Sequence, residues 1–116
     1  MQHTMQRSKY NNIKTTVLGV RFDSKKEGKR YGELLLLQRA GEISDLQMQV
    51  RIRLQDSFKD LEGHTHREII YIADFIYVDH KGDVIIEDVK GMATPVYKLK
   101  KKLLLNKYPY YRFREV

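Results

Sequence analysis

The chain has 116 residues, which suggests one domain with one core and leaves no room for a second module. It contains no cysteine, which excludes disulfides, cysteine-ligated zinc and thiol catalysis. The net charge is +7, from 22 Lys and Arg against 15 Asp and Glu. This excess favours a polyanionic partner such as nucleic acid, and a charge that only maintains solubility is the alternative.

The predicted elements begin after residues 1–8, which are polar and expected to be flexible. We expect a single domain over residues 9–116, in which residues 9–22 form an extended segment or small hairpin. A helix is predicted over residues 24–40. No apolar run is long enough to cross a membrane and no signal peptide is recognisable, so we expect a cytoplasmic protein without a membrane partner.

Both ends of this first helix carry clear signals. Ser24 is a typical N-cap, Glu27 occupies the capping-box position, and Gly41 follows the last helical turn. Glu27 shares a face with Tyr31 and Leu34 at helical spacing. Its carboxylate is therefore expected on the side of the helix that packs on the core.

Three strands are predicted next. Residues 46–54 alternate apolar and polar side chains, which is typical of a half-buried strand. Residues 57–67 are predicted to be a polar loop, and residues 69–78 to be a central strand covered on both sides. A three-residue turn with Gly82 in the left-handed conformation then leads to a returning strand over residues 84–90.

A second helix is predicted from Thr94, its N-cap, to Asn106, with Pro95 at the first helical position. Its inner side is predicted to consist of Val96, Leu99 and Leu103. Residues 110–115 alternate again and predict a last strand. The order is helix, three strands, helix, strand, which predicts an α/β fold with a central mixed four-stranded sheet flanked by helices.

Asp74 interrupts the most apolar strand, where an unpaired charge costs several kcal/mol. If Asp79 pairs with Asp83 across the turn, Asp74 lies opposite Asp88 with both side chains on one face. Two facing carboxylates repel each other unless a cation lies between them. This arrangement predicts an Mg²⁺ site of oxygen ligands beside Lys90, which shares the face of Asp88.

The same residues suit phosphodiester hydrolysis. An ion held by Asp74, Asp88 and the carbonyl of Val89 can bind a phosphate and acidify water, while Lys90 orients that water. Glu27 can contribute to the same site from the helix. The alternatives are structural: Asp88 and Lys90 as a strand-end ion pair, and Glu27 as a capping residue only. Convergence of all four residues on one end of the sheet favours the functional interpretation.

Three segments carry a resemblance to a known superfamily: Ser24–Glu27, Tyr71–Phe75 and Glu87–Gly91. In order and spacing they resemble the PD-(D/E)xK nucleases, and in particular a family of short phage and prophage proteins of unknown function. More distantly the chain resembles RecU-like and archaeal Holliday junction resolvases.

This resemblance implies a restriction-endonuclease-like αβββαβ core and a homodimer that cuts branched DNA in phage recombination or replication. It makes Glu27, Asp74 and Asp88 the metal-site acids and Lys90 the catalytic lysine, with Mn²⁺ able to replace Mg²⁺. Glu87 is the alternative third acid, since a slip of one residue exchanges it with Asp88. The competing functions are a nicking or restriction-like nuclease on duplex DNA and a DNA-binding protein of this fold that does not cut.

Basic side chains crowd both predicted helices. The first carries Arg30 beside several lysines and the second carries four lysines within five residues. They are candidates for phosphate contacts, with a solvated surface as the alternative. The candidate DNA-contacting residues are Lys98, Lys101, Lys25, Lys26 and Gln49.

Overall fold

The structure is a computed structural model, and it describes residues 15–17, 20–22, 24–89 and 93–116. The segment 1–8, predicted to be flexible, lies outside the described residues. The elements in chain order are β1 (Thr15–Val17), β2 (Val20–Phe22), α1 (Lys25–Arg39), β3 (Ile43–Gln55), β4 (Phe58–Lys59), β5 (Thr65–His66), β6 (Ile69–Asp79), β7 (Val84–Asp88), α2 (Pro95–Lys107) and β8 (Arg112–Glu115).

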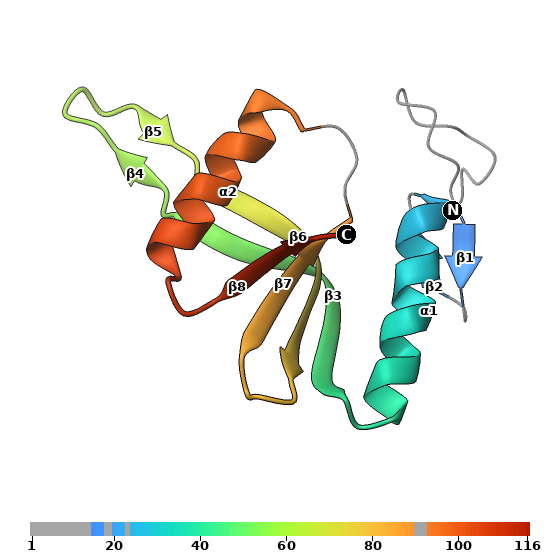
Figure 1. The fold of residues 1–116 in the computed structure, drawn as a ribbon. Coiled ribbons are helices and arrows are strands. Elements are labelled where there is room, and N and C mark those ends of the chain that lie inside the picture. Colours follow the sequence, from blue (N-terminus) through green and yellow to red (C-terminus); the bar gives the residue numbers. More distant parts are fainter. Residues whose placement is uncertain (1–14, 18–19, 23, 90–92) are drawn as a thin grey trace.

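The main sheet has four strands in the order β3-β6-β7-β8. Strand β6 runs antiparallel to both β3 and β7, and β8 runs parallel to β7 after the crossover through α2. Helices α1 and α2 lie on opposite sides of this sheet (Figure 1). The prediction of an α/β fold with a mixed four-stranded sheet and flanking helices is therefore confirmed. No helix in the described part of the chain is long and apolar enough to span a membrane.

Helix α1 begins and ends where its sequence signals predict. The side chain of Ser24 accepts a hydrogen bond from the Glu27 backbone N–H at 3.2 Å, which satisfies one of the free donors of the first turn. Gly41 follows the helix with φ of +82°, a conformation that glycine adopts without steric cost. These two ends place Glu27 in the first turn of the helix.

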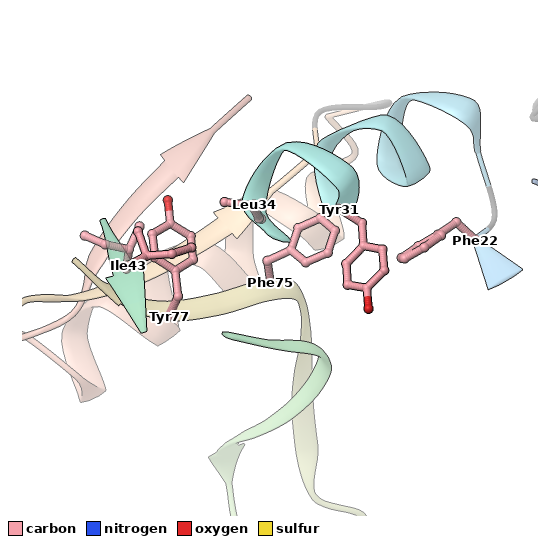
Figure 2. Close-up of a cluster of buried hydrophobic side chains, with 7 residues drawn as sticks. Phe22, Tyr31, Leu34, Ile43, Phe75 and Tyr77 are labelled. Carbon is pink, nitrogen blue, oxygen red and sulfur yellow. The ribbon is translucent and has the colours of Figure 1, made fainter. Parts of the chain in front are cut away.

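The first of two core clusters fixes α1 against the sheet. The ring of Tyr31 lies between Phe22 and Phe75, at centroid distances of 5.0 and 6.3 Å, as Figure 2 shows. Leu34 is fully buried in the same cluster. Because Glu27 lies one turn before Tyr31 on this face, packing of the aromatic rings directs the carboxylate toward the sheet.

The second cluster forms under α2 on the other side of the sheet. Leu104 is fully buried there against Ile86 and Tyr71, with Tyr97 packed at its margin. The predicted inner face of α2 is wrong for Val96 and Leu99, which are 61% and 57% exposed, whereas Leu103 packs against this cluster. The run Leu103–Leu105 is compatible with more than one rotation of the helix about its axis, and contact with the sheet selects the side that carries Tyr97 and Leu104.

The β6–β7 hairpin has the predicted register. The N–H of Asp79 donates to the carbonyl of Asp83 at 2.9 Å, and Gly82 has φ of +86°. Phe75 pairs with Glu87 farther along the hairpin. Extending this register by one residue places Asp74 opposite Asp88, so the turn length alone brings the two acids opposite each other.

The segment between β3 and β6 differs from the prediction of a polar loop. It contains the short antiparallel ladder β4–β5, in which the ring of Phe58 stacks on His66 at 4.7 Å. The hairpin projects from the body of the domain (Figure 1). The sequence of this segment does not alternate apolar and polar side chains, because both faces of the ladder are exposed, and the two strands were therefore not predicted.

Candidate active site

Two carboxyl groups from neighbouring strands form the centre of the site. The side chain of Asp74 on β6 interacts with the side chain of Asp88 at the end of β7. The other partner of Asp74 is the backbone of β7, since the N–H of Val89 donates to its Oδ2 at 2.8 Å. The acid pair predicted from the hairpin register is thus present, with both side chains on one face.

Glu27 joins this pair from helix α1. It is 8% exposed, and its charge acts on Asp74. The side chain of Gln49 on β3 donates to Glu27 Oε2 at 2.5 Å. The three acids therefore come from helix α1 and from the two strands of the β6–β7 hairpin, which is distant from α1 in the sequence. A fourth element, β3, supplies a hydrogen-bond donor.

The backbone at Gln49 is unusual. Its φ is +53°, a left-handed conformation that is uncommon for residues other than glycine. Met48 pairs with Phe75 and Val50 with Ala73, so Gln49 lies opposite Asp74, in the middle of the β3–β6 ladder. Strained residues of this kind cluster at functional sites, and here the conformation accompanies the contact with Glu27.

Burial and mutual repulsion perturb the acids. Burial, followed by the charges of Glu27 and Asp88, raises the pKa of Asp74 to about 7, although the Val89 N–H favours its ionised form. Burial also raises the pKa of Asp88, against its hydrogen bonds with Tyr71 and Asp74. The pair therefore holds a proton at a pH where isolated carboxylates are ionised.

This raised pKa predicts a pH-dependent stability without metal. The folded state holds the Asp74 proton up to about pH 7, whereas the unfolded chain releases it near its ordinary pKa. The stabilisation from this proton is complete in acid and is lost as pH rises through 7. In EDTA, the free energy of unfolding of Asp74→Asn should rise relative to that of the wild type as pH increases from about 4 to 7, and the difference should reach roughly 4 kcal/mol above pH 8. Urea unfolding at several pH values measures this difference in stability. For the exposed control Asp56→Asn, the difference from the wild type should stay constant with pH.

Glu87, the alternative third acid, lies on the other face of β7. Its side chain is fully buried, and Arg30 on α1 binds it through two N–H···O contacts of 2.8 and 2.6 Å. The Tyr77 hydroxyl also donates to it. Glu87 therefore belongs to a structural ion pair, and Asp88 is the acid that faces Asp74. Arg30, one of the basic residues considered for phosphate contact, has its guanidinium bound by Glu87 and Glu33.

Sequence reasoning missed two tyrosines beside the acids. The hydroxyl of Tyr71 donates to Asp88 Oδ1 at 3.0 Å, and the hydroxyl of Tyr97 donates to Glu115 Oε2 at 2.5 Å and also interacts with Asp88. Burial raises the pKa of both tyrosines, so they remain donors. The sequence contained one signal for Tyr71, because this residue lies only three positions before Asp74 in the same strand.

The candidate DNA-contacting lysines have different surroundings. Lys25, Lys26 and Lys98 are exposed. Lys101 is only partly exposed: its ammonium group lies 3.6 Å from Glu115 Oε2 and 4.7 Å from the ring centre of Phe113. Lys98 is therefore better placed than Lys101 to meet a phosphate from solvent.

Lys90, the predicted catalytic lysine, lies outside the described residues. Among the residues that the structure does describe, no group of three or more His, Cys, Asp or Glu side chains is arranged as ligands of one ion. The candidate oxygen ligands at the centre of the site are the carboxylates of Asp74 and Asp88, next to the backbone of Val89. Glu27 acts on Asp74 by charge from beside this pair.

Comparison with known proteins gives one match. Residues 7–116 match the family model described as "Protein of unknown function (DUF1064)". The chain belongs to this family. No curated protein and no solved structure matches this DUF1064 chain. The match covers all three elements that supply the acids.

Proposed function

We propose that this DUF1064 protein is a metal-dependent endodeoxyribonuclease of the PD-(D/E)xK type with a restriction-endonuclease-like core. The observation that carries the proposal is the Asp74–Asp88 contact with Glu27 beside it, three acids from three elements in a protein of net charge +7. A cluster of carboxylates is unfavourable for folding, because the acids repel one another and lose hydration on burial. Such a cluster is expected at a functional site, where binding of a substrate or an ion can offset the repulsion.

The donor set fits a hard divalent cation. Carboxylate and carbonyl oxygens are the ligands that Mg²⁺ and Mn²⁺ prefer, and Asp74, Asp88 and the Val89 carbonyl would supply them, with Glu27 adding charge. When bound, such an ion acts as a Lewis acid on phosphate and makes water more acidic. The raised pKa of Asp74 follows from crowding of negative charge that a cation would relieve.

The protein's own groups hold this arrangement in place. The Val89 N–H and the Tyr71 hydroxyl each bind one of the two aspartates, and Gln49 binds Glu27. Such outer contacts orient the acids before substrate arrives. Lys90, by resemblance to the superfamily, would orient water and offset charge that develops on the phosphate.

Branched DNA, including Holliday junctions, is the proposed substrate, and a homodimer that cuts two strands is the proposed assembly. The exposed lysines Lys25, Lys26 and Lys98 would contact phosphates. Lys101 would contribute only if its interaction with Glu115 opened.

A cleavage assay tests this proposal. Labelled four-way junction, linear duplex and single strand are each incubated with the protein in Mg²⁺, Mn²⁺ or EDTA. We expect cutting of the junction that requires metal. Equal nicking of duplex and junction would favour a nuclease for ordinary duplex. Metal-independent binding without product on any substrate would overturn the enzymatic proposal in favour of a DNA-binding protein.

Gln49 provides a sharper test of the outer contacts. Gln49→Ala and Gln49→Gly both remove the amide that binds Glu27, but only glycine adopts the left-handed backbone without strain. We expect both variants to cleave roughly 10–100-fold more slowly and to need more Mg²⁺. The glycine variant should nevertheless be more stable than the alanine variant by about 1 kcal/mol. If the more stable glycine variant instead cleaved faster than the alanine variant, Gln49 would matter for the backbone conformation and not for its contact with Glu27.

A further inference from the structure

A groove of about 530 Å³ opens beside the acid pair on the α2 side of the sheet. Asp88 forms part of its wall together with Tyr71 and Tyr97, which interact with that carboxylate. The groove is therefore continuous with the proposed active site. Its volume lies in the range of sites that bind a small ligand or one unit of a polymer.

Two exposed apolar side chains line the groove. Ile72 on β6 and Val96 on α2 both line it, although they are 48% and 61% exposed. Neither side chain belongs to the two core clusters. Exposed apolar walls of this kind favour a flat, weakly hydrated ligand.

Cationic groups also line the groove. Arg51 on β3 and Lys100 on α2 are part of its lining, and α2 begins there, after Thr94, with the positive end of its dipole. Two acids, Asp88 and Glu68, also line the groove, and Arg53 binds the carboxylate of Glu68 at 2.9 Å. The lining of the groove thus combines apolar and aromatic side chains with two cations.

We infer that this groove binds one unpaired nucleotide of the DNA strand whose phosphate lies at Asp74 and Asp88. The inference rests on the proposed function and specifies its substrate class. A nucleobase presents its apolar faces only when it is unpaired and unstacked, whereas a duplex presents base edges and phosphates. Aromatic and apolar contacts with such a base are tolerant of sequence, and Arg51 and Lys100 would bind the flanking phosphates.

The test uses two short duplexes of identical sequence, one fully paired and one with a single unpaired 2-aminopurine. Binding of each to the full-length protein is measured by anisotropy in EDTA, so that no cleavage is involved. We expect the wild type to bind the bulged duplex about tenfold more tightly. We also expect the 2-aminopurine fluorescence to fall on binding, because the base stacks in the groove.

Matched variants locate the effect. Val96→Ser and Ile72→Thr remove apolar surface from the groove and should reduce the preference to about twofold, while affinity for the paired duplex stays unchanged. Leu99→Ser is the control, because Leu99 is similarly exposed on the same helix but does not line the groove. Unchanged affinity for the paired duplex also reports that each variant is folded.

Three results would overturn the inference: equal affinity of the wild type for both duplexes, no change in fluorescence, or an equal loss in Leu99→Ser. These results are distinguishable from failure of the proposed function. A protein that cleaves DNA but shows no preference for the bulge keeps its nuclease activity and loses the nucleotide site. A protein that prefers the bulge but never cleaves keeps the site and loses the nuclease proposal.

Discussion

Asp88→Asn should reduce DNA cleavage in Mg²⁺ by at least roughly a thousandfold, which corresponds to about 4 kcal/mol of transition-state stabilisation. The substitution removes one negative charge and one charged oxygen ligand while it preserves the shape of the side chain. Tyr71 can still donate to the remaining carbonyl oxygen, so the local packing is retained. DNA affinity in EDTA should be equal to that of the wild type or slightly higher, because a charge that repels phosphate has been removed.

Asp83→Asn is the matched control for this prediction. Asp83 lies at the other end of the β6–β7 hairpin, where its carboxylate binds Arg112 at 2.8 Å, and the substitution changes charge by the same amount. We expect it to cleave at close to the wild-type rate. Cleavage by Asp88→Asn at that same rate would show that the acid pair takes no part in the reaction.

The largest effect on stability is expected at the buried ion pair between Arg30 and Glu87. Arg30→Met should lower the free energy of unfolding by about 3–5 kcal/mol, because it leaves the fully buried Glu87 with Tyr77 as its remaining described side-chain partner. Small domains have a total stability of about 5–15 kcal/mol, so the variant would be close to unfolding at ordinary temperature.

The double variant Arg30→Met/Glu87→Met provides the decisive comparison. It removes both charges and fills the same space, so most of the lost stability should return. Glu33→Ala is the control for the exposed part of the cluster, since Glu33 also binds Arg30, at 3.0 Å, and its loss should change stability by less than about 1 kcal/mol. Denaturant unfolding at neutral pH measures all three. A double variant as unstable as the single one would contradict a role for uncompensated charge.

Much of the acid pair could be derived from the sequence because a hairpin has few degrees of freedom. Once Gly82 identifies the turn, the register follows by counting, and Asp74 must lie opposite Asp88. The position of Glu27 followed equally from the cap at Ser24 and the helical period. These are local rules, in which residues close in sequence limit one another.

The choice between Asp88 and Glu87 shows where local rules end. Alternation places the two acids on opposite faces of β7, but it does not say which face meets the site. Helix α1 decides this by placing Arg30 against Glu87. The partner of Glu87 stands 57 residues away in the sequence, and no pattern around either residue indicates the contact.

The rotation of α2 shows the same limit from the opposite direction. Its apolar residues fit more than one buried stripe, and the prediction chose Val96, which is 61% exposed. Packing of Leu104 against Ile86 settles the angle and thereby opens the groove between α2 and the sheet.

The sequence by itself determined the order of the two helices and the four strands of the main sheet, the ends of both helices, the hairpin register and the pairing of the two aspartates. Each depends on backbone conformation or on periods of a few residues. Tertiary structure alone decided the burial of Glu87, the contact of Gln49 with Glu27 and the face that α2 presents. Those outcomes depend on side chains meeting across the sheet, where burial and charge neutralisation choose among arrangements that the local sequence permits equally.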